Sequence, residues 1–402
     1  MVIAAIALVV VRASRDVSDR RWGQAGAASL STGHELGHRR GGGRRQPGEV
    51  GITVADVGEF GLIARITARL GSARLGSAPA ALVGPGDDAA VLAAPDGRVV
   101  ATTDLLVEGR HFRCEWSSAY DVGRKAAAQN LADVAAMGAA PTGLLVGLAC
   151  PADLPLDWSD GLADGLRDEC AVAGCAVVGG DVVGSALLTV AVSALGDLQG
   201  RAPVLRSGAQ VGDVVCVVGA LGGAAAGLAV LQAGAEPGRV DPTKAVDPTK
   251  AAARHPGAVA AHQRPCPPYA AGVLAAVVGA TAMVDVSDGL LADLGHVAVA
   301  SGVAIALDPA AVPRHVEVAA VAVELGLRVD DLVLTGGEDH ALALTAPPAV
   351  AATLLGALAG WPEPVPGAVV GRVDAGAGVR LTDGAPTAGR GGYDHFASSG
   401  GS

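Results

Sequence analysis

Hydrophobic residues recur at helical spacing in several parts of the chain, with short apolar runs between them. Phe60, Ile63, Ile66 and Leu70 follow one another three or four positions apart, which predicts a helix over 59–70 with these residues on its buried face. Further helices are predicted at 121–137, at 159–173, directly after Gly223, at 289–300 and at 315–325.

Strands are predicted where short runs are rich in valine and other residues that favour an extended chain. They are 89–94, 98–103, 175–178, 187–195, 214–218, 282–286, 303–307 and 341–345. The first two flank Pro95-Asp96-Gly97, whose turn residues predict an antiparallel hairpin. Ser117 or Ser118 is placed to cap the helix that follows, and Gly174 to end the next one. Strands and helices alternate through the second half of the chain, which is typical of α/β proteins.

Breaks in the pattern divide the chain into three parts. Residues 1–55 are rich in Gly, Arg and Ser without a period, and we expect a disordered extension there. We expect an N-terminal domain over 56–198 and a C-terminal domain over 199–397. The second contains a predicted insertion at 234–262, where the repeat Val-Asp-Pro-Thr-Lys-Ala and several prolines indicate a loop outside the core.

Composition narrows the class of protein. Half of the 402 residues are apolar and 17% are charged, which indicates a globular protein. The formal charge of −11 argues against a general nucleic-acid binder. The apolar run Val2–Val11 is too short to span a bilayer, and arginines follow it rather than precede it, unlike a signal peptide. Six cysteines without a CxxC pair fit reduced thiols in the cytoplasm better than zinc or disulfides.

Four acidic clusters stand out in the first half of the chain. Asp88 opens one strand of the predicted hairpin and Asp104 closes the other, which places two carboxylates close enough to need a cation. Asp133 lies beside Asn130 on an alanine-rich helix, where a buried carboxylate requires a partner. Asp181 follows two glycines at a predicted strand end, where backbone can approach a phosphate. Unrelated turn aspartates and one exposed helical carboxylate are the alternatives.

The second half holds two more acidic turns. Asp285, Ser287 and Asp288 crowd a strand-to-helix junction, where Ser287 or Asp288 could simply cap the helix. Residues 335–339 form a similar turn, or an ordinary glycine turn. Residues 219–223 resemble a dinucleotide loop only weakly, and no Walker A sequence is present. Oxygen ligands without Cys or His indicate Mg²⁺, and several such ions fit a bound polyphosphate.

At these motifs the chain resembles the thiamine-monophosphate kinases, a family of the aminoimidazole-ribonucleotide-synthetase-like superfamily. The similar segments occur in the family's order at 58–65, 86–91, 102–112, 129–138, 179–181, 205–208, 285–296, 336–339 and 392–396. The resemblance implies a two-domain α/β fold, in which an N-terminal mixed sheet forms a homodimer interface and a C-terminal α/β domain follows. It also implies phosphorylation of thiamine monophosphate to thiamine diphosphate, with ATP as the donor and several Mg²⁺ ions.

The same resemblance assigns roles to individual residues. Metal ligation falls on Asp88, Thr102, Thr103, Asp104, Asp133, Asp181, Asp285 and Asp288. Contacts to ATP fall on Gly180, Asp181, Arg206 and Ser287, and contacts to the acceptor on His111, Glu338 and Tyr393. Catalysis is expected of Asp104, Asp133, Arg206 and Asp285, with Arg206 as a clamp on phosphoryl charge or, alternatively, a solvated surface arginine.

Two other functions are compatible with these residues. One is a different ATP-dependent reaction of the same superfamily, such as aminoimidazole ribonucleotide synthesis. The other is a non-catalytic, nucleotide-binding regulator. The complete set of carboxylates argues against the regulator, because a protein that had lost catalysis would not need them.

Overall fold

The computed structural model describes residues 52–71, 74–75, 78–79, 81–82, 84–85, 89–235 and 252–385. The first described helix, α2 (Val54–Leu70), begins with Thr53, whose backbone N–H donates to the Asp56 carboxylate at 2.7 Å. The fold therefore includes residues 52–55, which the sequence assigned to the extension. A kink at Gly58 turns Phe60 to solvent, so the predicted apolar face is wrong at Phe60, and Leu62 is the buried residue instead.

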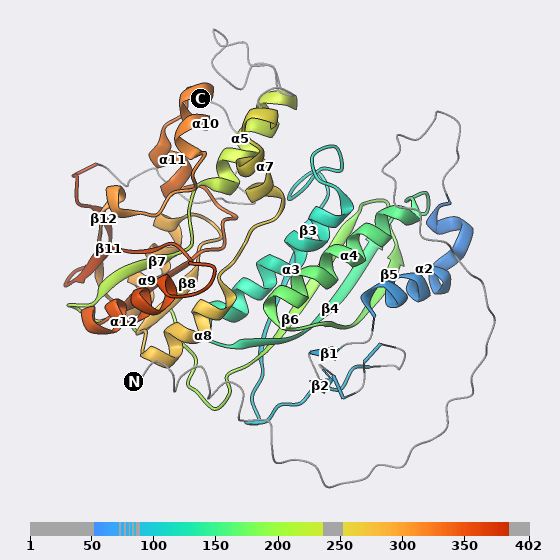
Figure 1. Ribbon diagram of the computed structural model, residues 1–402, viewed down its shortest axis with the longest axis horizontal. Coiled ribbons are helices and arrows are strands. Elements are labelled where there is room, and N and C mark those ends of the chain that lie inside the picture. The colour runs from blue at the N-terminus through green and yellow to red at the C-terminus, as the bar shows by residue number, and fades with distance from the viewer. Residues whose placement is uncertain are drawn as a thin grey trace. The chain divides into compact units, whose positions relative to one another are not determined.

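A four-stranded mixed sheet forms the centre of the first half of the fold (Figure 1). Its strands in spatial order are β3 (Val100–Val107), β6 (Thr189–Asp197), β4 (Ala140–Cys150) and β5 (Val177–Gly184). Only β4 and β5 are parallel; the other neighbours are antiparallel. A small separate pair, β1 (Arg74–Leu75) and β2 (Ala78–Pro79), lies outside this sheet.

Two long helices, α3 (Ala119–Ala136) and α4 (Leu156–Ala173), lie side by side against one face of this sheet (Figure 1). Ser118 caps α3 and Gly174 ends α4 in a left-handed conformation, as the sequence predicted. The helices approach so closely that a methyl group added to Gly165 of α4 would lie 2.1 Å from the Tyr120 carbonyl of α3. Their facing apolar residues form the first core.

The opposite face of the sheet leaves apolar side chains in solvent. Leu105 on β3, Leu145 on β4 and Val183 on β5 are 52%, 39% and 57% exposed. Side chains alternate along a strand, so the neighbours of Leu145 and Leu105, Leu144 and Leu106, are buried against the helices. An apolar sheet face of this kind is a candidate interface.

A six-stranded sheet forms the second half. Its spatial order is β12 (Gly378–Leu381), β9 (Ala304–Leu307), β11 (Gly367–Asp374), β7 (Val214–Val218), β10 (Leu342–Ala346) and β8 (Ala282–Asp285). The strands β9 and β12 run parallel, and the remaining pairs are antiparallel.

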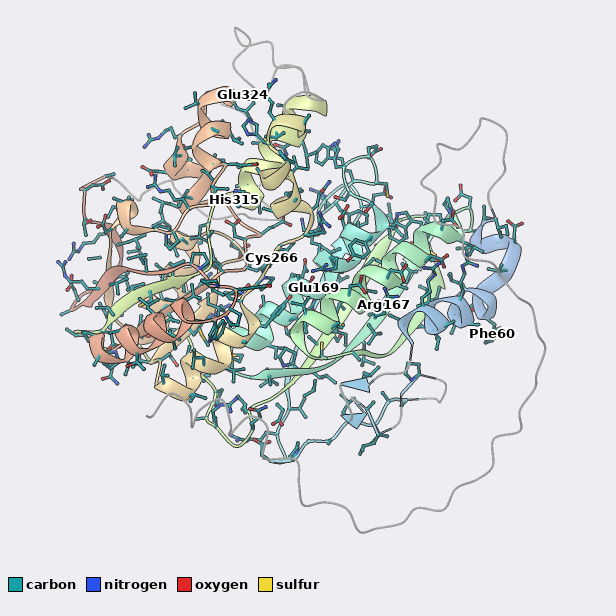
Figure 2. All side chains as sticks on the ribbon, in the orientation of Figure 1. Phe60, Arg167, Glu169, Cys266, His315 and Glu324 are labelled. Atoms are coloured by element: carbon teal, nitrogen blue, oxygen red, sulfur yellow. The ribbon has the colours of Figure 1, made fainter. Side chains whose placement is uncertain are left out.

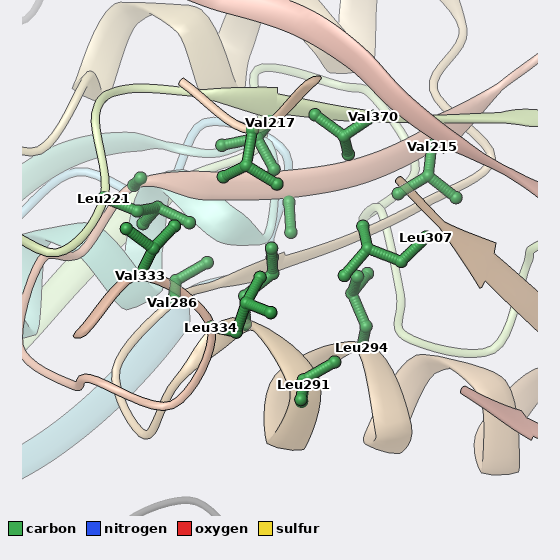
Figure 3. Packing of buried hydrophobic residues seen from close by; sticks show 14 of the residues in the cluster. Val215, Val217, Leu221, Val286, Leu291, Leu294, Leu307, Val333, Leu334 and Val370 are labelled. Carbon is green, nitrogen blue, oxygen red and sulfur yellow. The ribbon is translucent and has the colours of Figure 1, made fainter. Parts of the chain in front are cut away.

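Helices cover both faces of this sheet. The helices on one face are α5 (Gly223–Ala235), α7 (Pro256–Gln263), α9 (Leu290–Ser301), α10 (Val318–Leu325) and α11 (Val329–Leu334), with a short 3₁₀ turn at Pro309–Ala311. Figure 3 shows their core, in which Val215 and Val217 of β7 meet Leu294 of α9 and Leu334 of α11. On the other face, α8 (Tyr269–Val278) and α12 (Pro348–Ala359) pack against Cys216. The α/β class predicted from the sequence is confirmed.

The predicted hairpin is wrong. Across the described residues 89–99 there is no strand, although the turn forms, with Gly97 N–H donating to the Ala94 carbonyl at 3.0 Å. The strand β3 pairs instead with the distant β6 over eight residue pairs. A long apolar ladder outweighs the local turn signal here.

Two other predicted boundaries are wrong. Gly180 and Asp181 lie within β5 rather than after a strand, because β5 continues beside Val146–Cys150. The absent side chain of Gly180 allows close contact with the Val146 carbonyl, since a methyl group there would lie 2.1 Å from its oxygen. The segment 256–263, predicted as loop, is helix α7, and its Ala258 is fully buried against α5.

The sequence also missed several elements. They include β4, the third strand of the four-stranded sheet, and α8, α11, α12, β11 and β12. The repeat at 240–251 lies outside the described residues. No helix in the described part of the chain is long and apolar enough to cross a membrane. All six cysteines are described and all are free thiols.

Candidate active site

A cavity of about 800 Å³ lies between residues of the two halves of the fold. Its acidic wall consists of Asp104, Asp133, Asp285 and Asp288. Its apolar wall comes from Leu228 and the alanines of α5, together with aromatic residues of the loop between β3 and α3. A cavity with both kinds of wall suits a ligand that is charged at one end and ring-shaped at the other.

Strand alternation and helix spacing position the first two carboxylates. Thr102 and Asp104 lie on the face of β3 that meets α3, where the Thr102 hydroxyl donates to Asp133 Oδ2 at 2.6 Å. The Asp104 backbone N–H donates to Asn130 Oδ1 at 2.9 Å. Asn130 and Asp133 are thus neighbours on one helical face, as predicted, and Thr102 is a partner of the partly buried Asp133.

Asp285 ends β8 and meets a residue that the sequence analysis missed. His340 Nδ1 lies 3.1 Å from Asp285 Oδ2, and both side chains are buried. Burial alone lowers the pKa of His340, but the hydrogen bond and charge of Asp285 outweigh it and raise the pKa above its ordinary value. The only signal in the sequence was the position of His340 directly after the acidic turn at 335–339.

The carboxylates of this wall raise one another's pKa values. Burial, with the charges of Asp285 and Asp104, raises the pKa of Asp133 to about 6. Burial and Asp285 likewise raise the pKa of Asp104, although His340 opposes them. The acidic wall therefore carries more negative charge than its own side chains neutralise, which is a suitable environment for cations.

Neither Ser287 nor Asp288, the two candidate caps in the sequence, caps α9. Gly289, with a φ of 116°, occupies the N-cap position, and no side chain caps the helix there. Ser287 and Asp288 instead line the cavity. Asp293 accepts a hydrogen bond from the Asp288 N–H at 3.2 Å, and burial with the nearby Asp285 and Asp288 raises its pKa to about 7.

At the other end of the cavity, Glu338 lies beside Lys125 of α3. Lys125 Nζ donates to Glu338 Oε2 at 3.0 Å and to the His111 carbonyl at 3.1 Å. The Val107 N–H donates to His111 Nδ1 at 3.0 Å, which fixes that ring. His111 and Glu338, both predicted acceptor contacts, therefore line the same cavity as the acidic wall.

Asp339 binds the backbone of the glycine-rich turn before α5, and this turn therefore has a structural role. Its carboxylate accepts from the Gly222 N–H at 2.6 Å and from the Ala224 N–H at 2.8 Å. These amides are the ones that a dinucleotide loop would direct at phosphate. The weak resemblance of residues 219–223 to such a loop is therefore not supported.

Several predicted site residues do not line the cavity. Gly180, Asp181 and Arg206 are exposed elsewhere on the fold. The Thr103 side chain lies on the face of β3 opposite Asp104, where its hydroxyl donates to the Val192 carbonyl at 3.0 Å. Asp88 and Tyr393 lie outside the described residues.

The donor set of the acidic wall fits magnesium in kind. Asp104, Asp133, Asp285 and Asp288 offer carboxylate oxygens, which hard divalent cations prefer. Within the described ranges, no three histidine, cysteine or carboxylate side chains are close enough to hold an ion by themselves. A cation held here would take further ligands from water or from a bound phosphate.

Comparison with known proteins first defines the class. The protein-family model described as AIR synthase related protein, N-terminal domain, matches residues 86–198. The family model of the corresponding C-terminal domain matches residues 210–384. The two halves of the fold, with the cavity between them, are thus those of an AIR synthase related protein.

Full-length relatives identify the family within this class. Thiamine-monophosphate kinase of Mycobacterium tuberculosis is 44% identical over 346 residues, which cover 86% of this chain and 93% of the relative. The chain belongs to the thiamine-monophosphate kinase family.

Solved structures agree with this identification. The thiamine-monophosphate kinase of Stenotrophomonas maltophilia K279a is 34% identical with a TM-score of 0.67, covering 80% of this chain and 96% of that one. The structure of AaThiL complexed with AMPPCP and TMP is 30% identical, with a TM-score of 0.64. The match covers 86% of this chain and 99% of that chain.

Proposed function

We propose that the protein transfers the γ-phosphoryl group of ATP to thiamine monophosphate and releases thiamine diphosphate and ADP. The names of its relatives and the AMPPCP and TMP of the AaThiL complex support this reaction. The single observation that carries it is the cavity, which joins the acidic wall of Asp104, Asp133 and Asp285 to His111 and Glu338. One end suits a polyphosphate with its cations and the other an organic acceptor.

The chemistry requires alignment and charge neutralisation more than proton transfer. The acceptor atom is a phosphate oxygen that is already anionic, so no strong general base is needed. Magnesium, when bound, would supply the positive charge that lets phosphates and carboxylates coexist. The residues proposed to hold it are Asp104, Asp133, Asp285 and Asp288, which line the cavity. The family resemblance alone adds Asp88, Thr102, Thr103 and Asp181 to the proposed set. The chain's own task is to hold both substrates in line.

The remaining site residues are divided between contacts to ATP and contacts to the acceptor. Gly180, Asp181, Arg206 and Ser287 are proposed to contact ATP. The charge of Arg206 reaches Asp293 and opposes, without reversing, the rise in the pKa of that carboxyl. His111, Glu338 and Tyr393 are proposed to contact the acceptor.

A homodimer through the N-terminal sheets completes the proposal. The exposed side chains of Leu105, Leu145 and Val183 lie on one sheet face, and a second copy that packs on this face would remove them from water. Six free thiols fit a cytoplasmic location for this assembly.

The direct test supplies purified protein with ATP, Mg²⁺ and thiamine monophosphate and measures thiamine diphosphate. Product is expected with Mg²⁺ and none after chelation with EDTA, with full recovery when Mg²⁺ is restored. A parallel reaction with formylglycinamidine ribonucleotide tests the rival superfamily activity. Turnover of that compound alone, or binding of ATP without any turnover, would reject the kinase assignment in favour of the synthetase or the regulator.

A further inference from the structure

Lys125 is a lysine in the interior of the fold. It lies in the middle of α3 and only 2% of it is exposed. Lysine is almost never fully buried unless paired, because removing an ammonium group from water carries a large free-energy cost. Its two contacts, the Glu338 carboxylate at 3.0 Å and the His111 carbonyl at 3.1 Å, compensate that cost.

These two partners come from opposite halves of the fold. His111 belongs to the loop between β3 and α3, and Glu338 to the loop between α11 and β10, 213 positions after Lys125. The same β3–α3 loop is tied to the second half once more, because the Gln263 side-chain amide donates to the Trp116 carbonyl. Lys125 therefore fixes the distance between two segments that line one cavity.

The geometry leaves one oxygen of Glu338 for a ligand. Lys125 and the buried His262 both contact Oε2, with His262 Nδ1 at 3.4 Å. The side chain of Glu338 is nevertheless 31% exposed, and it lines the cavity. Oε1 has no hydrogen-bond partner among the residues that the structure describes, and it is the oxygen left to accept a hydrogen bond from a bound molecule.

The backbone also holds Glu338 in place. Its φ of 67° is in the left-handed region, which is strained for a residue that has a Cβ atom. The turn keeps this conformation because the Glu338 N–H donates to the Ser287 carbonyl at 2.8 Å, and because Asp339 is bound to the start of α5. The direction of the carboxylate is therefore set before any ligand arrives.

Charge balance in this cluster depends on the lysine. Burial and the nearby Lys125 lower the pKa of His262 to about 3, so its ring is neutral near pH 7. Burial alone would raise the pKa of Glu338, but the charge of Lys125 opposes it and the net shift is downward. Glu338 stays ionised because the ammonium of Lys125 neutralises it.

We propose that Lys125 is a positioning residue for the phosphoryl acceptor, which holds the Glu338 carboxylate and the His111 loop in the arrangement that binds thiamine monophosphate. The inference rests on the proposed function and deepens it. Lys125 does not line the cavity, whereas His111 and Glu338 do, so Lys125 acts through these two residues.

The test separates binding of the acceptor from binding of ATP. Lys125→Met keeps most of the length of the unbranched side chain and removes its charge. We expect the KM for thiamine monophosphate to rise at least 10-fold and the KM for ATP to change less than 2-fold. A merely structural role would move both constants or neither.

Arg167→Met is the matched control. Arg167 lies on α4 (Figure 2), where it is half exposed and pairs with Asp164 and Asp168 at the surface. Loss of an exposed ion pair has a small effect, so both KM values are expected to stay within 2-fold of wild type.

A double-mutant cycle shows whether Lys125 acts through Glu338. In a Glu338→Gln background, Lys125→Met is expected to change the KM for thiamine monophosphate less than 3-fold, because no carboxylate is left for Lys125 to hold. If Lys125→Met does not fold, Lys125→Gln replaces it in the same cycle, because glutamine keeps an N–H donor without the charge.

The outcomes distinguish this inference from the function on which it rests. If wild-type protein makes thiamine diphosphate but the folded Lys125 variants have unchanged constants, or raise both KM values equally, the positioning role is rejected and the kinase remains. Full additivity in the cycle also rejects it. If wild-type protein makes no thiamine diphosphate, the proposed function is rejected itself.

Discussion

Asp133 shows what a single residue requires in this fold. It lies in an alanine-rich helix, is hydrogen-bonded by Thr102, and still has a pKa raised to about 6 by burial and by the charge of Asp285. The hydrogen bond stabilises the carboxylate without removing the repulsion between neighbouring acids. A cation at the acidic wall would remove that repulsion, so the carboxylates are better suited to a ligand-bound state than to the free protein.

Replacing Asp104 by Asn tests this interpretation. Turnover is expected to fall about 100-fold or more, since the proposed cation site would lose one of its charged ligands. The melting temperature is expected to stay near wild type or rise, because burial and Asp285 already disfavour the ionised carboxylate, as its raised pKa shows. Steady-state kinetics and thermal unfolding measure the two effects.

Asp374→Asn is the control for this substitution. Asp374 forms exposed ion pairs with Arg372 and Arg380 away from the cavity, so turnover should be unchanged. Near-normal turnover by the Asp104 variant would contradict the metal role.

At this scale the sequence predicted the acidic residues and missed those that join them. Spacing identified Asp104, Asp133 and Asp285, because acidic residues beside apolar runs are unusual in themselves. Lys125 and His340 carry no such signal, since their partners lie 213 and 55 positions away. Only the folded chain brings these residues together.

Among the elements, α3 and α4 depend on close packing at glycine. Gly165→Ala places a methyl group 2.1 Å from the Tyr120 carbonyl, and we expect the free energy of unfolding to fall by about 1–3 kcal/mol. Denaturant unfolding monitored by circular dichroism measures this change.

Gly356→Ala in α12 is the matched control. No atom lies within 4 Å of the added methyl group, so alanine's higher helix propensity should leave stability unchanged or raise it by up to about 1 kcal/mol. Equal effects of the two substitutions would refute the close-packing argument.

The start of α5 makes stability depend on pH through Asp339. Burial raises the pKa of Asp339 to about 6, despite its two backbone hydrogen bonds. Between about pH 4 and pH 6 the folded protein keeps a proton that the unfolded chain releases, so raising the pH through this interval lowers the free energy of unfolding. The full difference is on the order of 2–3 kcal/mol.

Asp339→Asn removes this titration. The stability of wild type relative to Asp339→Asn is therefore expected to decline from pH 4 to pH 7 when urea unfolding is compared at each pH. Asp153→Asn, at an exposed position, is the control and should show no such trend. A constant difference between wild type and Asp339→Asn over this interval would overturn the interpretation.

Element prediction succeeded where the pattern was long or caps were clear. The helices α3 and α4 and the strand β7 lie close to their predicted positions, because periodicity, Ser118 and Gly174 all agree. The hairpin failed because a local turn signal cannot reveal that β3 pairs with β6, about ninety positions later. The helix α7 was missed because prolines around it read as loop.

For the whole molecule, the exposed sheet face predicts self-association. Leu145→Glu places a charge at the centre of this face on β4, where a packed second copy could not solvate it. Sedimentation velocity is expected to show a dimer for wild type and a monomer for the variant.

Val299→Glu serves as the comparison, because Val299 is exposed on α9 in the other half of the fold. The Val299→Glu variant should remain dimeric. A wild-type monomer, or a Leu145→Glu dimer, would exclude assembly through this face.

The contact between Lys125 and Glu338 has a consequence for biosynthesis. At 5–20 residues per second, a ribosome needs about 10–40 s to add the 213 residues that separate them. Throughout that interval the emerging N-terminal half holds a lysine whose carboxylate partner does not yet exist. The proposed acceptor pocket is therefore among the last parts of the enzyme to be completed, because a nascent chain truncated before the Glu338 turn lacks two of the three proposed acceptor contacts, Glu338 and Tyr393.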